Sequence, residues 1–194
     1  MAAKRPASRR GKASTAQTRT AEHALLGLLA ESGDDGVHGY DLIKRFADGA
    51  LADIIRIEPG MLYHHLKSMA TRGWLITTVE RQASRPDRQM HIITDVGQAS
   101  LTTWLAEPVR ATRELRLEFL VKLYLMERLA PHQVDQLVEA QYSVIDNLIA
   151  SLEQQRNALN SEDPDLPFRQ HVHDLRISQN RAARQWLLDL QCNP

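Results

Sequence analysis

The chain has 194 residues, of which 43% are hydrophobic and 25% are charged, so it can bury a core and is not a disordered polymer. Its single cysteine, Cys192, excludes a disulfide framework and a cysteine-built zinc site within one chain. No apolar run approaches the ~18 residues of a membrane span, and residues 1–20 hold no Leu, Ile, Val or aromatic residue that could form a signal-peptide core. We therefore expect a protein that stays in the reducing cytoplasm and has no membrane segment.

The formal net charge of zero conceals an uneven distribution along the chain. The first 20 residues carry only basic charges, at Lys4, Arg5, Arg9, Arg10, Lys12 and Arg19. Because this segment also lacks large apolar side chains, it cannot offset its ordering entropy, and we expect residues 1–20 to be a disordered basic tail. Such a tail is a solvated segment, an arm that follows DNA phosphates, or an organellar transit peptide.

Three short helices are predicted after the tail. The first has apolar residues from Ala21 to Leu29 and begins at Thr20, a residue type that caps helices. The second runs from Tyr40 to Ala47 and ends at Asp48-Gly49. The third begins at Glu58-Pro59 and ends before Gly73, because proline suits the first helical position and glycine the position just beyond a helix.

The third helix has two distinct faces. Leu62, Leu66 and Met69 recur at helical spacing and predict one buried stripe, with His65 near its boundary. The side chains that could enter a DNA groove belong to Gly60, Met61, Tyr63, His64, Lys67, Ser68 and Thr71. Any surface helix shows such a polar face, so this pattern alone also fits a solvated helix.

The next segment predicts a β-hairpin. Residues 74–79 and 90–94 are short and rich in β-branched side chains, and the turn between them carries Arg81, Arg85 and Arg88. A fourth helix follows Thr94 and ends before Pro108. The order helix, helix, helix, hairpin, helix predicts a winged helix-turn-helix over residues 21–107.

Separated motifs over residues 21–107 resemble the PadR-like transcriptional regulator family. They are His38-Gly39-Tyr40-Asp41-Leu42-Ile43, Gly60 to Lys67, Arg72-Gly73-Trp74-Leu75, Arg85-Pro86, and Ile93 to Gly97 with Leu101, Trp104 and Leu105. Two features depart from the family pattern. His91 stands where the family usually has tyrosine in the second wing strand, and Met61 with His64 makes the reading face atypical. The operator of a relative therefore cannot be transferred to this chain.

After Pro108 every pattern is helical. Residues 115–126 are apolar on nearly all sides, which indicates a helix that is covered almost all round. Apolar residues then recur every seven positions at Val138, Ile145, Leu152 and Leu159. This spacing is typical of a helix packed against another helix, and Gln141 and Gln155 interrupt it, which favours a short bundle over an extended coiled coil.

The last helix carries an apolar stripe at Phe168, Val172, Leu175, Ala182, Trp186 and Leu190. The family resemblance implies that residues 108–194 form a homodimer interface. The expected fold is therefore mainly α with a small β-hairpin wing, divided into a DNA-binding part and a helical dimerisation part.

The sequence gives little support for an enzyme or for a metal-binding protein. The sequence lacks the G-x-S-x-G, G-x-x-x-x-G-K-[ST] and G-x-G-x-x-G motifs, and no two of its eight histidines stand three or four residues apart. We expect no catalytic residue, no cofactor and no metal site. Trp104 is either a core aromatic or, as the resemblance implies, part of a site for a flat aromatic effector.

These observations predict a homodimeric regulator that binds double-stranded operator DNA in the cytoplasm, at the nucleoid. We expect it to be a repressor that a small effector releases from DNA. Lys44 and Arg45 would contact the DNA backbone together with the wing arginines. The alternative is a winged-helix adaptor that binds proteins, which the acidic charge of the chain beyond residue 20 favours, whereas the locally basic residues 58–88 favour DNA.

Overall fold

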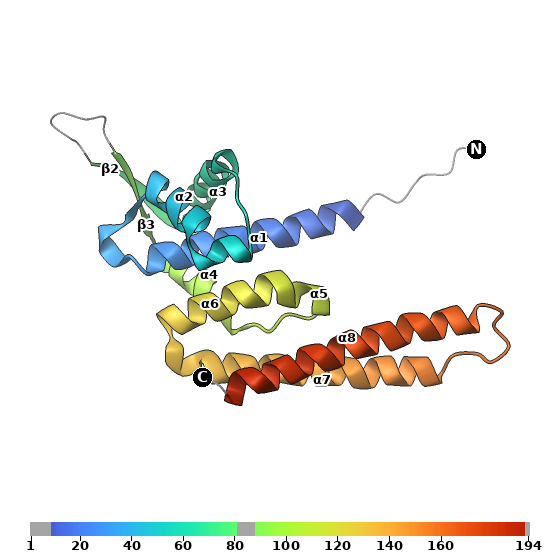
Figure 1. The fold of residues 1–194 in the computed structure, drawn as a ribbon. Coiled ribbons are helices and arrows are strands. Elements are labelled where there is room, and N and C mark those ends of the chain that lie inside the picture. Colours follow the sequence, from blue (N-terminus) through green and yellow to red (C-terminus); the bar gives the residue numbers. More distant parts are fainter. Residues whose placement is uncertain (1–8, 81–87, 193–194) are drawn as a thin grey trace, which may run out of the picture.

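The computed structural model describes residues 9–80 and 88–192 and is mainly helical, with one small antiparallel sheet (Figure 1). The first half contains α1 (Arg9–Ala30), β1 (Val37–His38), α2 (Gly39–Asp48), α3 (Pro59–Thr71), β2 (Leu75–Glu80), β3 (Arg88–Ile93) and α4 (Asp95–Ala106). The second half contains α5 (Thr112–Glu114), α6 (Leu120–Leu129), α7 (Val134–Asn157) and α8 (Leu166–Cys192). The predicted fold class is confirmed.

Helix α1 begins much earlier than the sequence suggested. It starts at Arg9, so the predictions that residues 9–20 are disordered and that Thr20 caps the helix are wrong. Thr20 lies inside the helix, where its hydroxyl donates to the carbonyl of Ala16 at 3.0 Å. Arg19 pairs with Glu107 and Glu118 at 3.5 and 3.4 Å, and such contacts from a distant part of the chain stabilise a helix that local composition alone does not.

The expectation of a basic tail falls partly outside the described residues. Lys4 and Arg5 lie outside the described residues, whereas the backbone at Arg9, Arg10 and Lys12 is helical and forms part of α1.

The sheet contains one strand more than the predicted hairpin. Its strand order is β1-β3-β2, with Val37 of β1 opposite His91 and Leu75 of β2 opposite Ile93. The short β1 therefore covers the second edge of β3 and fixes the start of α2 against the wing.

A single core joins the two halves of the chain. Helix α1 runs through its centre, and Leu25, Leu26 and Leu29 are fully buried. The helix passes so close to α6 at Gly27 that a Cβ there would lie 2.3 Å from a methyl group of Leu125. Glycine at this position thus allows the winged half to pack directly on the helical half.

The second half contains an unpredicted distortion. Between α5 and α6, Leu115–Phe119 form a π-helical turn, a rare geometry that often occurs at functional sites. Helices α7 and α8 then form a long antiparallel hairpin that extends beyond the rest of the molecule (Figure 1). Gln141, which interrupts the apolar seam of α7, is fully buried and makes two hydrogen bonds to the backbone of Val109, at 2.7 and 2.9 Å.

The apolar stripe of α8 divides between two environments. Ile177 and Leu187, which the predicted stripe does not include, are the buried apolar residues of this helix, and Trp186 of the stripe packs edge-on against Phe119 with ring centroids 5.9 Å apart. Phe168 and Leu175 instead remain 70% and 60% exposed. Part of the stripe is therefore available for a surface outside this chain.

Candidate nucleic-acid interface

Helix α3 has well-defined ends. Pro59 occupies its first turn, and Gly73 follows its last turn with φ +71°, a left-handed conformation that favours glycine. The amide of Trp74 donates to the carbonyl of Met69 at 3.0 Å, and the hydroxyl of Thr94 donates to the carbonyl of Gly73 at 2.6 Å. The end of α3 is thus fixed to the start of α4.

The inner face of α3 carries a buried ionic contact in addition to the predicted apolar stripe. His65 is 4% exposed, so its placement near the boundary is wrong, and its Nδ1 lies 3.7 Å from Oε1 of Glu22 in α1. Arg72 reaches the same oxygen at 2.6 Å while its guanidinium lies over the ring of Trp74. Burial raises the pKa of Glu22, but His65 and Arg72 outweigh burial and hold that pKa below its ordinary value.

The outer face of α3 presents the predicted side chains. The exposed residues are Gly60, Met61, Tyr63, His64, Lys67 and Thr71, and Ser68 is half-buried. Met61 and Tyr63 are 49% and 47% exposed, so two large side chains lie on this outer face. The hydroxyl of Thr71 donates to the carbonyl of Lys67 within the helix at 3.0 Å, so it is already engaged.

Helix α2 adds one exposed aromatic residue to this surface. Tyr40 opens the helical spacing of large side chains from which this helix is predicted, but it is 63% exposed in the first turn. The neighbouring Gly39 lies against the ring of Tyr63, so the two tyrosines belong to one surface. The position of Tyr40 directly after His38-Gly39, at the start of the helix, is the signal that could have identified Tyr40 as a surface residue.

The two basic residues of α2 behave differently. Lys44 is exposed, whereas Arg45 turns toward the end of α1. The guanidinium of Arg45 donates to the hydroxyl of Ser32 at 3.2 Å and lies 3.9 Å from Glu31. Of the two predicted backbone contacts, Lys44 is therefore the better placed.

Only part of the prediction for the wing can be compared with the structure. Arg81 and Arg85 lie outside the described residues, and Arg88 begins β3 opposite Glu80 in the strand register. His91 is 5% exposed, and its Nδ1 lies 3.1 Å from the hydroxyl of Thr77 on β2. Burial, followed by the charge of His38, lowers the pKa of His91, so this histidine favours its neutral form inside the wing.

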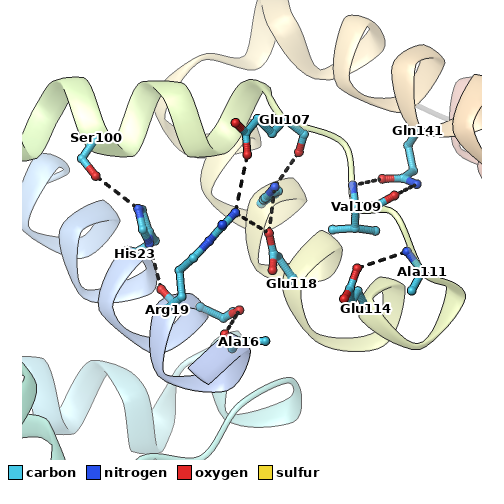
Figure 2. A network of polar contacts seen from close by, with 12 residues as sticks. Ala16, Arg19, His23, Ser100, Glu107, Val109, Ala111, Glu114, Glu118 and Gln141 are labelled. Carbon is cyan, nitrogen blue, oxygen red and sulfur yellow. Dashed lines mark hydrogen bonds and ion pairs between the residues drawn. The ribbon is translucent and has the colours of Figure 1, made fainter. Parts of the chain in front are cut away.

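A polar junction connects the winged half to the helical half (Figure 2). Lys122 of α6 is fully buried, and its Nζ donates to the backbone oxygen of Glu107 at 2.5 Å and to Glu118 at 3.0 Å. Burial lowers the pKa of Lys122, and the neighbouring Glu118 partly offsets this effect. Arg19 binds the same two glutamates from α1, so the orientation of α1 relative to α6 depends on this ionic network.

Trp104 lies at the centre of this junction. It is 3% exposed and stacks on His23 with ring centroids 4.7 Å apart, while Nζ of Lys122 lies 4.8 Å from its ring centroid. His23 in turn contacts the carbonyl of Arg19 through Nδ1 at 2.8 Å and the hydroxyl of Ser100 through Nε2 at 3.3 Å. In the single chain, Trp104 is thus a core residue that touches both halves.

The family is decided by the segment that contains α2, α3, the wing and α4. Residues 25–103 match the sequence model of the Transcriptional regulator PadR-like family. This segment of the chain is PadR-like. This assignment confirms the resemblance carried by the motifs of α2 and α3.

Two relatives of this PadR-like protein have transcriptional regulator in their names. The chain is 34% identical over 91 residues to the probable transcriptional regulator Rv1176c of Mycobacterium tuberculosis, covering 47% of this chain and 46% of the relative. It is 24% identical over 123 residues to the negative transcriptional regulator PadR of Bacillus subtilis, covering 63% and 65%. The chain thus spans between about half and two thirds of the length of these relatives.

Among solved structures, the chain is similar to Bacillus subtilis PadR in complex with operator DNA. The match has 20% sequence identity and a TM-score of 0.43, and it covers 87% of this chain and 95% of that one. Within the described residues, no helix of this PadR-like protein is long and apolar enough to cross a membrane. No group of three or more His, Cys, Asp or Glu residues that could hold a metal ion occurs in that same part of the chain.

Proposed function

We propose that this PadR-like protein is a sequence-specific regulator that binds double-stranded DNA and represses by occupying its operator. The proposal rests on the difference between the inner and outer faces of α3. Its inner face is locked to α1 through Glu22, while Met61, His64 and Lys67 project outward from a helix of a width that the major groove admits. A rigid helix with adaptable outer side chains is what base readout requires.

The contacts would divide by chemistry. Lys67 and Lys44 would hold phosphates, which positions the helix without reading sequence. His64 would reach hydrogen-bonding base edges, and the apolar Met61 and Tyr63 would favour the methyl group of thymine. Arg81, Arg85 and Arg88 of the wing would hold the flanking phosphates or enter the minor groove, and Gly60, Ser68 and Thr71 would complete the reading surface. The basic residues before Arg19 would add phosphate contacts from the N-terminal side, whereas Arg19 itself is paired with Glu107 and Glu118.

Operator binding would need a homodimer. One winged domain, proposed here as residues 21–107, offers a single recognition helix, and affinity rises when two are held at the spacing of successive half-sites. The exposed Phe168 and Leu175 stand two helical turns apart on α8, which supports residues 108–194 as the dimerisation part.

A small effector would release the protein from DNA by acting through the polar junction. A small effector that favours another position of α6 relative to α1 would change the spacing of the two recognition helices. Trp104, which touches both α1 and α6 through His23 and Lys122, is the residue we assign to this coupling. Such a regulator would work in the cytoplasm, at the nucleoid.

Selection of bound duplexes from a random DNA library tests the function directly. We expect enrichment of a palindrome with half-sites about one helical turn apart, in which the position nearest His64 changes when His64→Ala is used for the same selection. Arg176→Ala, an exposed basic residue of α8, serves as the matched control and should enrich the same sequence. No enrichment at low salt would contradict the proposal and favour a protein-binding adaptor.

A further inference from the structure

A groove of about 900 Å³ is lined by the C-terminal parts of α1, α2 and α6. The lining residues used below are Leu28, Glu31, Arg45, Tyr124, Arg128 and Leu129. Because α2 belongs to the winged half and α6 to the helical half, the groove touches both halves of the chain. Its volume falls within the range of about 300 to 1,000 Å³ that is typical of sites for small molecules.

One carboxylate holds two arginines at this groove. Oε1 of Glu31 lies 2.5 Å from Nε of Arg128, and Oε2 of Glu31 lies 3.9 Å from Nη1 of Arg45. The side chain of Glu31 is largely buried, whereas both arginines are exposed. Two positive charges and one negative charge give this group a net charge of +1, so the groove favours an anion.

Both guanidinium groups keep donors for a further ligand. Arg128 uses its Nε for Glu31, and Arg45 uses its Nη1, which also donates to the hydroxyl of Ser32 at 3.2 Å. Within residues 9–80 and 88–192, the other N–H groups of these two side chains have no hydrogen-bond partner. The carboxylate therefore fixes one edge of each guanidinium and leaves the rest of it available to an anion.

The remaining walls used here are apolar or aromatic. Leu28, Leu129 and Tyr124 contribute to them. The guanidinium of Arg128 lies 5.2 Å from the ring centroid of Tyr124, and this cation–π contact restrains both side chains. The groove thus combines restrained cationic groups with a surface that suits a planar apolar group.

We propose that this groove binds a small nucleotide through its phosphate group. Arg45 and Arg128 would donate to the phosphate oxygens, because the fork of a guanidinium matches the geometry of phosphate, and the base would pack against Tyr124 and Leu129. The net charge of +1 balances the single charge of a phosphodiester better than the larger charge of a phosphomonoester. The apolar walls argue for a small nucleotide over the backbone of duplex DNA, which would leave these walls uncovered.

A nucleotide in this groove would contact both halves of the chain. A phosphate bonded to Arg45 of α2 and to Arg128 of α6 would add a connection between these helices beside Glu31. Such a connection would favour one position of the winged half on the helical half, and thereby one spacing of the two recognition helices in a dimer. This regulatory role rests on the proposed function, whereas nucleotide binding itself does not.

Isothermal titration calorimetry on the full chain without DNA tests the site. The probes are AMP, GMP and their 3′,5′-cyclic forms, with adenosine and guanosine as the uncharged counterparts. We expect at least one nucleotide to bind, and to bind at least about tenfold more tightly than its nucleoside, since hydrogen bonds to charged groups typically exceed the 1.4 kcal/mol of a tenfold change. The charge balance predicts that the cyclic form binds more tightly. The reverse order would also support the site and would identify a phosphomonoester as its ligand.

Replacing one arginine tests the proposed phosphate contacts. Arg45→Gln should weaken nucleotide binding at least about tenfold. This variant leaves the bridge between Arg128 and Glu31 intact, so the protein should keep its fold. Arg128→Gln should weaken binding by a similar factor, but it also removes the closer partner of Glu31, so Arg45→Gln is the decisive variant.

Arg56→Gln is the matched control, because Arg56 is an exposed arginine of the winged half that does not line the groove. Its nucleotide affinity should equal that of the unchanged protein, and thermal melts should show that all variants remain folded. An equal loss in Arg56→Gln, binding that Arg45→Gln retains, equal affinities for nucleotide and nucleoside, or no binding by any probe at millimolar concentration would each overturn the site.

DNA binding, measured separately by fluorescence anisotropy, distinguishes these failures from a failure of the proposed regulator. If Arg45→Gln lowers the salt dependence of DNA binding and leaves nucleotide affinity unchanged, Arg45 contacts the DNA backbone and the nucleotide site is wrong. If nucleotide binds as expected and no duplex DNA binds, the site stands and the proposed regulator fails.

Discussion

Arg72 and Glu22 form an ion pair of 2.6 Å that joins the end of α3 to α1. The carboxylate of Glu22 is nearly buried, at 7% exposure, and Arg72 is 39% exposed, so the pair is shielded mainly on the side of the glutamate. Since α1 also packs on α6, this pair connects α3 to the helical half through α1. It therefore contributes to the orientation of α3 as well as to its stability.

Removing this carboxylate tests the link. We expect Glu22→Gln to lower the free energy of unfolding by about 1–3 kcal/mol, because Arg72 and His65 lose their shared partner. The pKa of Glu22 lies below its ordinary value of 4.5, so the stabilisation is present above pH 4.5 and is lost as pH falls through the lowered pKa. Urea unfolding of the protein and the variant should thus converge in acid. Glu127→Gln, at an exposed site of α6, should change little at any pH, and an equal loss in both variants would contradict the special role of Glu22.

His23 predicts a second pH dependence, near neutrality. Burial lowers its pKa below 6.5, so the neutral ring on Trp104 is stable above pH 6.5 and that stability declines as pH falls through the lowered pKa. His23→Phe keeps an aromatic ring beside Trp104 and removes the titration. The stability of the protein relative to this variant should therefore rise as pH approaches 6.5 from below. The exposed His132→Gln should produce no such slope, and a flat difference for His23→Phe would refute the assignment.

The elements that local signals define were predictable, and those that depend on distant partners were not. Pro59 and Gly73 act through their own backbone geometry, so the bounds of α3 follow from sequence alone. The helical conformation at Arg19, just before the predicted start of α1, is supported instead by its contacts with Glu107 and Glu118, which lie about half a chain away in the numbering. No local pattern shows such a partner.

The residues of the candidate site also divide into those predictable from local spacing and those that depend on distant partners. The outward direction of His64 and Lys67 follows from helical spacing, because Leu62 and Met69 mark the inner face. The burial of His65 depends on Glu22, which belongs to another helix. Lys122 was equally unpredictable, since its partner is the backbone oxygen of Glu107 and a backbone acceptor leaves no sequence signal.

Base and phosphate contacts on α3 should respond differently to substitution. Lys67→Ala should weaken operator and random DNA alike and reduce the salt slope by about 0.9, because one phosphate contact releases about that many counterions. His64→Ala should weaken the operator by about 1–3 kcal/mol and random DNA much less. Anisotropy titrations over a salt series measure both effects. Arg176→Ala on α8 is the control for a lost surface charge, and a Lys67→Ala slope equal to that of Arg176→Ala would remove Lys67 from the interface.

Gly27 and Leu125 are closely packed, so the stability changes caused by substituting them should not be additive. Gly27→Ala places a Cβ at 2.3 Å from Leu125, and although alanine favours a helix, the clash in a fully buried region should cost about 1–3 kcal/mol. In the double variant with Leu125→Ala, the added methyl group gains space, so the combined cost should be smaller than the sum of the single costs. Chemical denaturation of the four proteins gives this coupling, and strict additivity would show that the added methyl group does not interact with Leu125.

The outer face of α8 should hold the dimer. Phe168→Asp with Leu175→Asp changes two side chains that are 70% and 60% exposed in the single chain, so the fold should persist while a partner surface is lost. We expect sedimentation to show monomers with an unchanged helix content, and operator affinity to fall because two recognition helices are no longer linked. Trp186 is unsuitable for this test, because its contact with Phe119 makes it part of the core. The control, Asn147→Asp with Gln154→Asp, adds the same charge to exposed sites of α7 and should remain dimeric. If the α8 variant also remains dimeric with full operator affinity, the interface must lie elsewhere on the helical half, on surfaces of α6 or α7.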